Sequence, residues 1–216
     1  SLYDSTNPYS SSIKYGYESN GVAQFSYTAT TAGTYYLQAN SDSSSSGKYT
    51  VKATAIADDH SDTTTSAIAL TLGTPKNGNI EAAGDVDYFK VDLVVGKKYL
   101  FEMNDLTLGT SGDAYLNLQN SNGYNLAYGY EGYSNNKAIF SYTATTAGTY
   151  YLKASSDDDS IGKYTVKATA VTDDFGNTTT TAKVLALETT LNGNIEVPQD
   201  VDYFKVSLTA GKKYYF

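Results

Sequence analysis

Several residue types are missing or scarce in this chain of 216 residues. Cysteine, tryptophan and arginine are absent, and histidine occurs once. Without cysteine there is no disulfide framework, thiolate metal site or thiol nucleophile. Without arginine there is no bidentate guanidinium contact to phosphate or carboxylate, and 15 lysines against 23 acidic residues give no basic surface for nucleic acid.

Long apolar runs are absent as well. No stretch approaches the roughly 18 apolar residues of a membrane span, and the first residues, SLYDSTNPYS, lack the basic and then apolar pattern of a signal peptide. We therefore expect no membrane insertion. The acidic composition, rich in Ser, Thr, Asn, Gly and with 22 tyrosines, favours a secreted, extracellular or cell-surface protein.

The most informative pattern is an internal repeat with an offset of 115 residues. From Phe25 to Phe101, 53 of 77 residues are identical to the residue 115 positions later, without a gap. The preceding stretch, from Leu2 to Gln24, aligns with Leu118 to Ile139 when one residue is added. Two copies this similar must share one fold.

The repeat is out of phase with the chain. Residues 57–171 form one complete unit, residues 1–56 the C-terminal half of a unit, and residues 172–216 the N-terminal half of the next. The sequence therefore predicts three segments: half of a repeat unit, one complete unit and half of another unit.

The sequence of each unit predicts β-structure. Apolar and polar residues alternate in VDYFKVDL from Val86, in KKYLFEM from Lys97 and in GKYTVKATA from Gly162, with Ser, Asn, Gly and Asp clusters between such segments. We expect the first two to form a hairpin around residues 94–96. The predicted fold class is all-β, with tandem β-sandwich (jelly-roll-like) modules of about 115 residues.

The order of motifs resembles the bacterial pre-peptidase C-terminal domain. The motifs are DD-x-x-[DN]-T, NGNIE, DVDYFKVDLVVGKKY, FSYTATTAGTYYLKAS and GKYTVKATA. The resemblance implies a calcium-associated β-sandwich, which is appended to secreted proteases or repeated in large extracellular proteins. It also implies that the segment ahead of the first strand and the DxD motif contribute to a calcium site.

Aspartates gather at the positions where that site is expected. Several like charges at one corner of a fold repel one another unless a cation neutralises them, and hard oxygen ligands suit calcium. The alternative is that they are solvated turn formers. The candidate ligands of a structural calcium are Asp58, Asp59, Asp62, Asp85 and Asp87, and in the second copy Asp173, Asp174, Asn177, Asp200 and Asp202.

Two further acidic residues, Glu81 and Glu196, are expected to be outward-facing strand residues. The single histidine, His60, is replaced by Phe175 in the second copy, so the repeat does not preserve a general base there. We expect no enzymatic activity.

A second set of candidates consists of tyrosines in the Gly/Asn/Ser-rich region. Exposed tyrosine is a rigid contact residue, so this set could bind a neighbouring subunit, a glycan or a collagen-like ligand, or could form aromatic cross-strand pairs in a hairpin. Its members are Tyr15, Tyr17, Tyr124, Tyr128, Tyr130 and Tyr133.

Two functions follow from these observations. The first is a structural repeat of a secreted or cell-surface protein, in which calcium-stiffened sandwiches form a stalk, adhesin or filament. Copies could also join head to tail by strand complementation. The alternative is an accessory module of a secreted hydrolase that binds polysaccharide or a collagen-like protein fibre.

Overall fold

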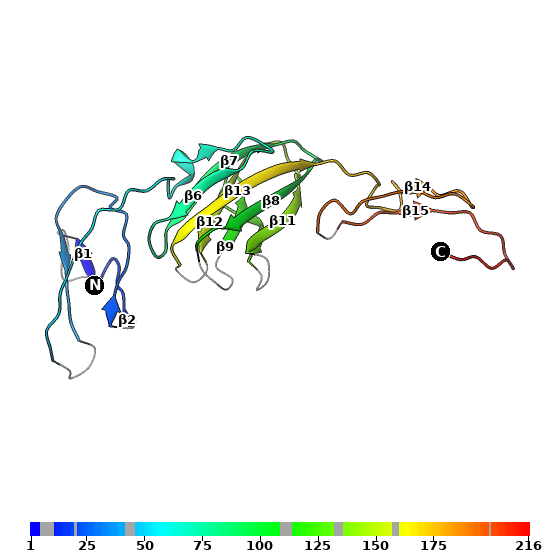
Figure 1. The fold of residues 1–216 in the computed structure, drawn as a ribbon. Helices are drawn as coiled ribbons and strands as arrows, with labels where there is room; N and C mark the ends of the chain where they lie inside the picture. Colours follow the sequence, from blue (N-terminus) through cyan, green and yellow to red (C-terminus); the bar gives the residue numbers. More distant parts are fainter. Residues whose placement is uncertain are drawn as a thin grey trace.

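Strands dominate the fold, seen in a computed structural model (Figure 1). The structure describes residues 1–4, 11–19, 21–41, 46–108, 114–131, 136–156, 160–198 and 200–216. Within these ranges the helical structure is a single 3-10 turn over Thr64–Ser66, where the weakly helical sequence TTTSAIALTL lies. No helix among the described residues has the length and apolar character needed to cross a membrane.

A β-sandwich occupies the middle of the chain. Its first sheet has the order β10-β9-β12-β7-β5, and its second the order β11-β8-β13-β6. The strands of the first sheet are β5 (Ile68–Ala69), β7 (Val86–Leu93), β9 (Ala114–Gln119), β10 (Asn125–Tyr130) and β12 (Gly148–Ser156). The strands of the second are β6 (Lys76–Ile80), β8 (Lys98–Asp105), β11 (Lys137–Thr143) and β13 (Gly162–Val171).

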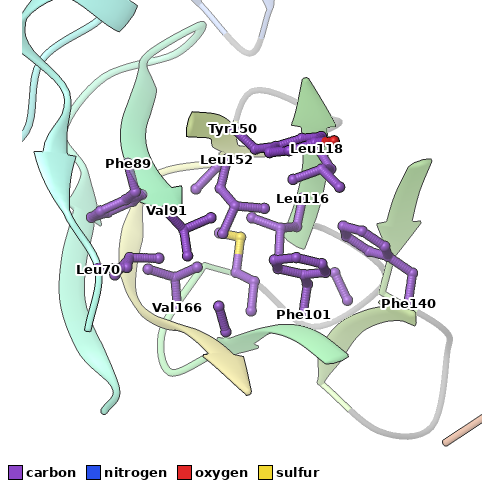
Figure 2. Packing of buried hydrophobic residues seen from close by; sticks show 14 of the residues in the cluster. Leu70, Phe89, Val91, Phe101, Leu116, Leu118, Phe140, Tyr150, Leu152 and Val166 are labelled. Atoms are coloured by element: carbon purple, nitrogen blue, oxygen red, sulfur yellow. The ribbon is translucent and has the colours of Figure 1, made fainter. Parts of the chain in front are cut away.

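The core lies between the two sheets because each long strand has one apolar face. In β8 every second residue is buried, and in β13 Tyr164, Val166 and Ala168 are buried while the intervening Lys and Thr side chains face outward. Phe101 stacks on Phe140 with ring centroids 5.2 Å apart. Figure 2 shows these rings packed among leucine and valine side chains from both sheets. An all-β sandwich, as the alternating pattern predicts, is the observed fold.

The predicted hairpin between β7 and β8 is wrong. β7 pairs with β12 and β5, whereas β8 pairs with β11 and β13 in the opposite sheet. A turn with Gly96 at φ 75°, closed by a bond from the Lys97 amide to the Val94 carbonyl, carries the chain from one sheet to the other. The alternation of apolar and polar residues shows which face of each strand is buried. Two strands that pair in one sheet and two strands that face each other across a core have the same alternation.

The two flanking segments have little regular structure. In the N-terminal one, β1 (Leu2–Asp4) pairs with β4 (Tyr35–Leu37), and β2 (Glu18–Ser19) pairs with β3 (Val22–Ala23). In the C-terminal one, β14 (Lys183–Val184) runs parallel to β15 (Phe204–Lys205). Figure 1 shows the flanks leaving opposite ends of the sandwich.

Candidate acidic and tyrosine sites

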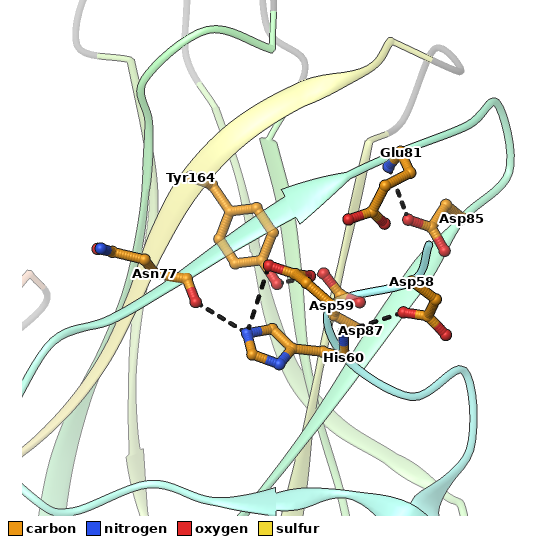
Figure 3. Close-up of polar contacts among 8 residues, drawn as sticks. All are labelled: Asp58, Asp59, His60, Asn77, Glu81, Asp85, Asp87 and Tyr164. Atoms are coloured by element: carbon orange, nitrogen blue, oxygen red, sulfur yellow. Dashed lines mark hydrogen bonds and ion pairs between the residues drawn. The ribbon is translucent and has the colours of Figure 1, made fainter. Parts of the chain in front are cut away.

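The acidic cluster lies where the chain enters the sandwich. Asp58 and Asp59 precede β5, the first strand of the sandwich, and Glu81 follows β6. One carboxylate oxygen of each of these three residues lies within 4.8 Å of the others (Figure 3). Glu81 is therefore part of the cluster, and its description as an outward strand residue is wrong. The signal in the sequence was its recurrence as Glu196 in the repeated NGNIE motif.

Asp85 sits against the same group of carboxylates. Its Oδ2 atom accepts a hydrogen bond from the Glu81 amide at 2.9 Å, and its Oδ1 atom accepts one from the Val86 amide at 2.9 Å. Burial, together with the neighbouring Glu81 and Asp62 side chains, raises the pKa of Asp85 to about 7. The pKa values of Asp58 and Asp59 are also raised, chiefly by partial burial. Ionising the whole cluster thus costs free energy unless a cation is present.

Asp87 lies beneath this cluster on β7 and is fully buried. The Tyr164 hydroxyl on β13 donates a hydrogen bond of 2.5 Å to its Oδ2 atom, which lowers the pKa of the carboxyl, yet burial raises that pKa to about 8 overall. Among the residues of this cluster and of the strand beneath it, Asp62 Oδ1, Glu81 Oε2 and Asp87 Oδ1 are buried carboxylate oxygens without a hydrogen-bond partner. Unpartnered buried oxygens are costly, and they are what a bound cation would satisfy.

His60 packs beside this group of carboxylates. Its ring meets Phe89 edge-on at 4.9 Å, and its Nε2 atom lies 2.8 Å from the Asn77 carbonyl oxygen and 3.8 Å from Asp59 Oδ2. Its amide donates to Asp58 Oδ1 at 2.9 Å, which helps to hold the turn that carries the cluster (Figure 3).

The second copy forms similar groups in the C-terminal flank. Carboxylate oxygens of Asp173, Glu196 and Asp200 lie within 4.8 Å of one another, as do those of Asp173, Asp174 and Asp202. The pKa of Asp202 is raised, chiefly by burial. Two predicted ligands, Asp62 and Asn177, are not among these groups of three. Asn177 is exposed, and Asp62 accepts a 2.7 Å hydrogen bond from the Thr28 hydroxyl of the N-terminal flank.

Asp200 has a partner that the sequence did not reveal. Lys98 Nζ, at the start of β8, lies 2.7 Å from Asp200 Oδ1, and this ion pair lowers the pKa of Asp200 to about 2. Lys98 belongs to the end of the sandwich where the chain leaves it, and Asp200 belongs to the following segment. The pair therefore ties the acidic cluster of the C-terminal flank to the start of β8 in the sandwich.

The predicted tyrosines fall on both parts of the chain. Tyr124, Tyr128 and Tyr130 are exposed on or beside the edge strand β10, and Tyr15 and Tyr17 contact each other edge-on at 5.3 Å in the N-terminal flank. Tyr133 lies outside the described residues. The predicted cross-strand aromatic contact is present, since Tyr128 stacks on Tyr115 of β9 with ring centroids 5.9 Å apart.

A shallow groove of about 540 Å³ runs beside this stack. It lies between β10 and β11, with Pro198 of the C-terminal flank at its border. Apolar rings and a few polar groups face it, which is the composition of many ligand sites. Its lining includes Tyr115, Asn125, Tyr128, Phe140 and Ser141.

The fold and the sites define a β-sandwich protein with an acidic cluster at one end. Residues 85–156 match the model of a family described as the bacterial pre-peptidase C-terminal domain. No curated protein matches the chain.

Two solved structures are similar in part. A crystal structure of the pre-peptidase C-terminal domain of collagenase from Bacillus anthracis is 19% identical, with a TM-score of 0.40, and covers 47% of this chain and 93% of its own. PliG from Aeromonas hydrophila, a periplasmic inhibitor of g-type lysozyme, is 7% identical, with a TM-score of 0.39, and covers 49% of this chain and 96% of its own.

Proposed function

We propose that this chain is a non-enzymatic segment of a secreted or cell-surface protein, in which the sandwich is an accessory module that binds extracellular polysaccharide. The family match over residues 85–156 supports the accessory role. The observation that supports a sugar ligand is the stack of exposed Tyr128 on half-buried Tyr115 beside the groove. Flat aromatic rings contact the apolar faces of sugar rings, and neighbouring amide and hydroxyl groups orient them by hydrogen bonds.

The test is co-sedimentation of the full chain with insoluble cellulose, chitin and collagen fibrils. We expect binding to a polysaccharide and a loss of at least tenfold in affinity in the double variant Tyr115→Ala and Tyr128→Ala. Tyr88→Ala is the matched control, because Tyr88 lies on the outer surface of the same sheet but not in the groove. Binding to collagen alone, or equal binding by both variants, would refute the polysaccharide assignment.

We also propose that the acidic clusters hold structural calcium ions. Asp58, Asp59 and Glu81 would bind the ion in the sandwich, and Asp173, Asp174 and Asp202, with Glu196 and Asp200 close by, would bind it in the following segment. The support is the fit of the sites. The oxygen donors are hard and closely spaced, and Glu81, Glu196 and Asp202 each have a buried oxygen without a partner among the described residues. Burial and neighbouring carboxylates raise the pKa values of Asp58, Asp59 and Asp202. The ion would supply charge neutralisation and rigidity.

Thermal unfolding of the full chain in EGTA and in calcium tests this site. If calcium binds only the folded state, it adds about 2.7 kcal/mol at a hundredfold excess over Kd. Magnesium should stabilise less, because the ion is smaller and keeps its water. The double variant Glu81→Gln and Glu196→Gln should lose most of the calcium effect, whereas Glu188→Gln, at an exposed residue outside both clusters, should keep it. Identical melting in EGTA and calcium would exclude the site.

A second candidate function is a stiff repeat array that forms a stalk, adhesin or filament. The contacts at the two junctions favour it. The Thr28 hydroxyl donates to Asp62, the Ser26 hydroxyl donates at 2.5 Å to the Ala83 carbonyl, and Lys98 pairs with Asp200. An acidic cluster at each junction would let calcium set the stiffness between successive units. Small-angle X-ray scattering that reports the same flexibility with EGTA and with calcium would count against this candidate.

A further inference from the structure

The two flanks contact the sandwich at two junctions, and the N-terminal junction shows how such a contact is made. The Ser26 hydroxyl donates a 2.5 Å hydrogen bond to the carbonyl of Ala83, in the turn between β6 and β7. Two residues further along the flank, the Thr28 hydroxyl donates a 2.7 Å hydrogen bond to Asp62 Oδ2. Two hydroxyl groups of one short segment therefore hold this flank against the sandwich.

The same donors and acceptors recur 115 residues later, at the C-terminal junction. The equivalent hydroxyls are those of Ser141 and Thr143, which belong to β11 of the sandwich. The equivalent acceptors belong to the flank. Pro198 has its backbone carbonyl, and Asn177 has a side-chain oxygen where the N-terminal junction has an aspartate. The C-terminal junction therefore has the groups needed to form both hydrogen bonds.

At the C-terminal junction these groups are not joined. Ser141 and Pro198 both line the groove of about 540 Å³, and Thr143 and Asn177 are exposed. Among the described residues, no hydrogen bond connects Ser141 with Pro198 or Thr143 with Asn177. The groove therefore lies where the equivalent contact is closed at the N-terminal junction.

An ion pair already holds the C-terminal flank beside β11. Lys98 Nζ lies 2.7 Å from Asp200 Oδ1, and Lys98 is directly opposite Thr143 in the β8–β11 pairing. Asp200 is two residues from Pro198, and two residues span about 7 Å at most. The Pro198 carbonyl is therefore held near the strand that carries Ser141, and a local movement of the flank can bring the two together.

We propose that β11 is a docking strand for the C-terminal flank. In the docked state Ser141 donates to the Pro198 carbonyl and Thr143 donates to Asn177, and this contact closes the groove. The partner of this face is a segment of the same chain, bound by the pair of hydrogen bonds that the N-terminal junction shows. With the junction open, as in this structure, the groove is accessible to a ligand.

A polysaccharide in the groove excludes the docked flank, because Ser141 and Pro198 line the space that the sugar occupies. The two binding events therefore weaken each other by the same factor, since linkage between them is reciprocal. The competition rests on the proposed polysaccharide site, whereas the docking of the flank does not. The docking can therefore be tested without any sugar.

A cross-link across the groove tests the docking, since the chain has no cysteine of its own. The double variant Ser141→Cys and Pro198→Cys is treated with a short thiol–thiol cross-linker under native conditions. The reference is Ser26→Cys and Ala83→Cys, which has the same separation of 57 residues and a closed contact. We expect an intramolecular product at a rate within threefold of the reference. A rate more than threefold below the reference would overturn the docking.

A further substitution separates the two hydrogen bonds from the ion pair, which could bring the thiols together alone. Adding Thr143→Val to the Ser141→Cys and Pro198→Cys pair keeps the shape of the side chain and removes its donor. Cross-linking should slow by up to about fivefold, the loss expected for one hydrogen bond. Thr28→Val, the same change at the other junction, should leave the rate unaltered. Equal rates with Thr143→Val and with Thr28→Val would refute the assigned contact.

Polysaccharide binding tests the competition and needs no cysteine. For cellulose or chitin bound in the groove, Thr143→Val should raise the affinity by up to about fivefold, because it weakens the docked state without altering a residue that lines the groove. Thr28→Val should leave the affinity unchanged. An affinity that Thr143→Val lowers or leaves unchanged would refute the competition. Failure of the chain to bind any polysaccharide would refute the proposed function, and the cross-linking rates would still decide the docking.

Discussion

Removal of a single hydroxyl, Tyr164→Phe, probes the hydrogen bond beneath the acidic cluster. The Tyr164 and Asp87 side chains are both fully buried, and they are joined by a 2.5 Å bond between β13 and β7. Phenylalanine keeps the ring that packs against Gly78 but leaves the carboxyl of Asp87 without the tyrosine donor. A hydrogen bond to a charged group contributes about 1.5–3 kcal/mol, so at pH 9, where Asp87 is ionised, we expect a loss of about 2 kcal/mol in the free energy of unfolding.

The loss is measured by urea denaturation and by thermal melting followed by circular dichroism. In a domain of about 100 residues, 1 kcal/mol corresponds to about 4–8 °C, so the melting temperature should fall by roughly 8–16 °C. The loss should be larger at pH 9 than at pH 5. The pKa of Asp87 is raised to about 8, and the bond is stronger when the carboxyl is ionised.

Tyr150→Phe is the matched control. Tyr150 is also a buried strand tyrosine, but its hydroxyl donates to the Thr146 carbonyl at 3.0 Å, in a turn near the surface. A neutral bond of this kind contributes about 1 kcal/mol. If Tyr164→Phe costs no more than Tyr150→Phe at either pH, the contact between Tyr164 and Asp87 does not stabilise the sandwich and the reasoning fails.

Two further predictions concern the same region. In EGTA, the free energy of unfolding should fall by about 2 kcal/mol from pH 4 to pH 8. In the unfolded chain Asp85 and Asp87 ionise near pH 4, whereas burial raises their pKa values in the folded chain to about 7 and 8. An equal or higher melting temperature at pH 8 would contradict this. Gly78→Ala should lower the free energy of unfolding, measured by urea denaturation, by about 1–3 kcal/mol, because the added Cβ would lie 2.3 Å from the Tyr164 ring. Gly33→Ala, with open space around the added Cβ, should lower it little. Similar losses for the two variants would show that Gly78 can accommodate a methyl group.

Much of the sandwich could be predicted from the sequence because burial has a period of two in its strands. The alternation in GKYTVKATA identifies the buried face of β13 residue by residue. The same pattern could not separate a hairpin from a crossing between sheets, because β7 and β8 each bury one face in either arrangement. Partner choice depends on distant strands, here β12 for β7 and β13 for β8.

The candidate sites were predictable to a similar degree. Aspartates that are close in sequence also lie close in space where a turn brings them together, as Asp58 and Asp59 do. Glu81 was missed because it follows a strand and comes close to these residues only when β6 is folded beside them. The ion pair between Lys98 and Asp200 joins residues 102 positions apart, and their spacing carries no local signal.

The path of the chain through the sandwich has a mechanical consequence. The Tyr88 amide donates to the Ser61 carbonyl near the start of β7, so the chain enters at that end, and it leaves after Val171, opposite Lys98 at the other end. A pulling force on the two flanks therefore acts along the strands. The parallel β5–β7 bonds are loaded in shear, so they must break together and not one at a time. Such a module resists stretching more than its equilibrium stability alone would suggest.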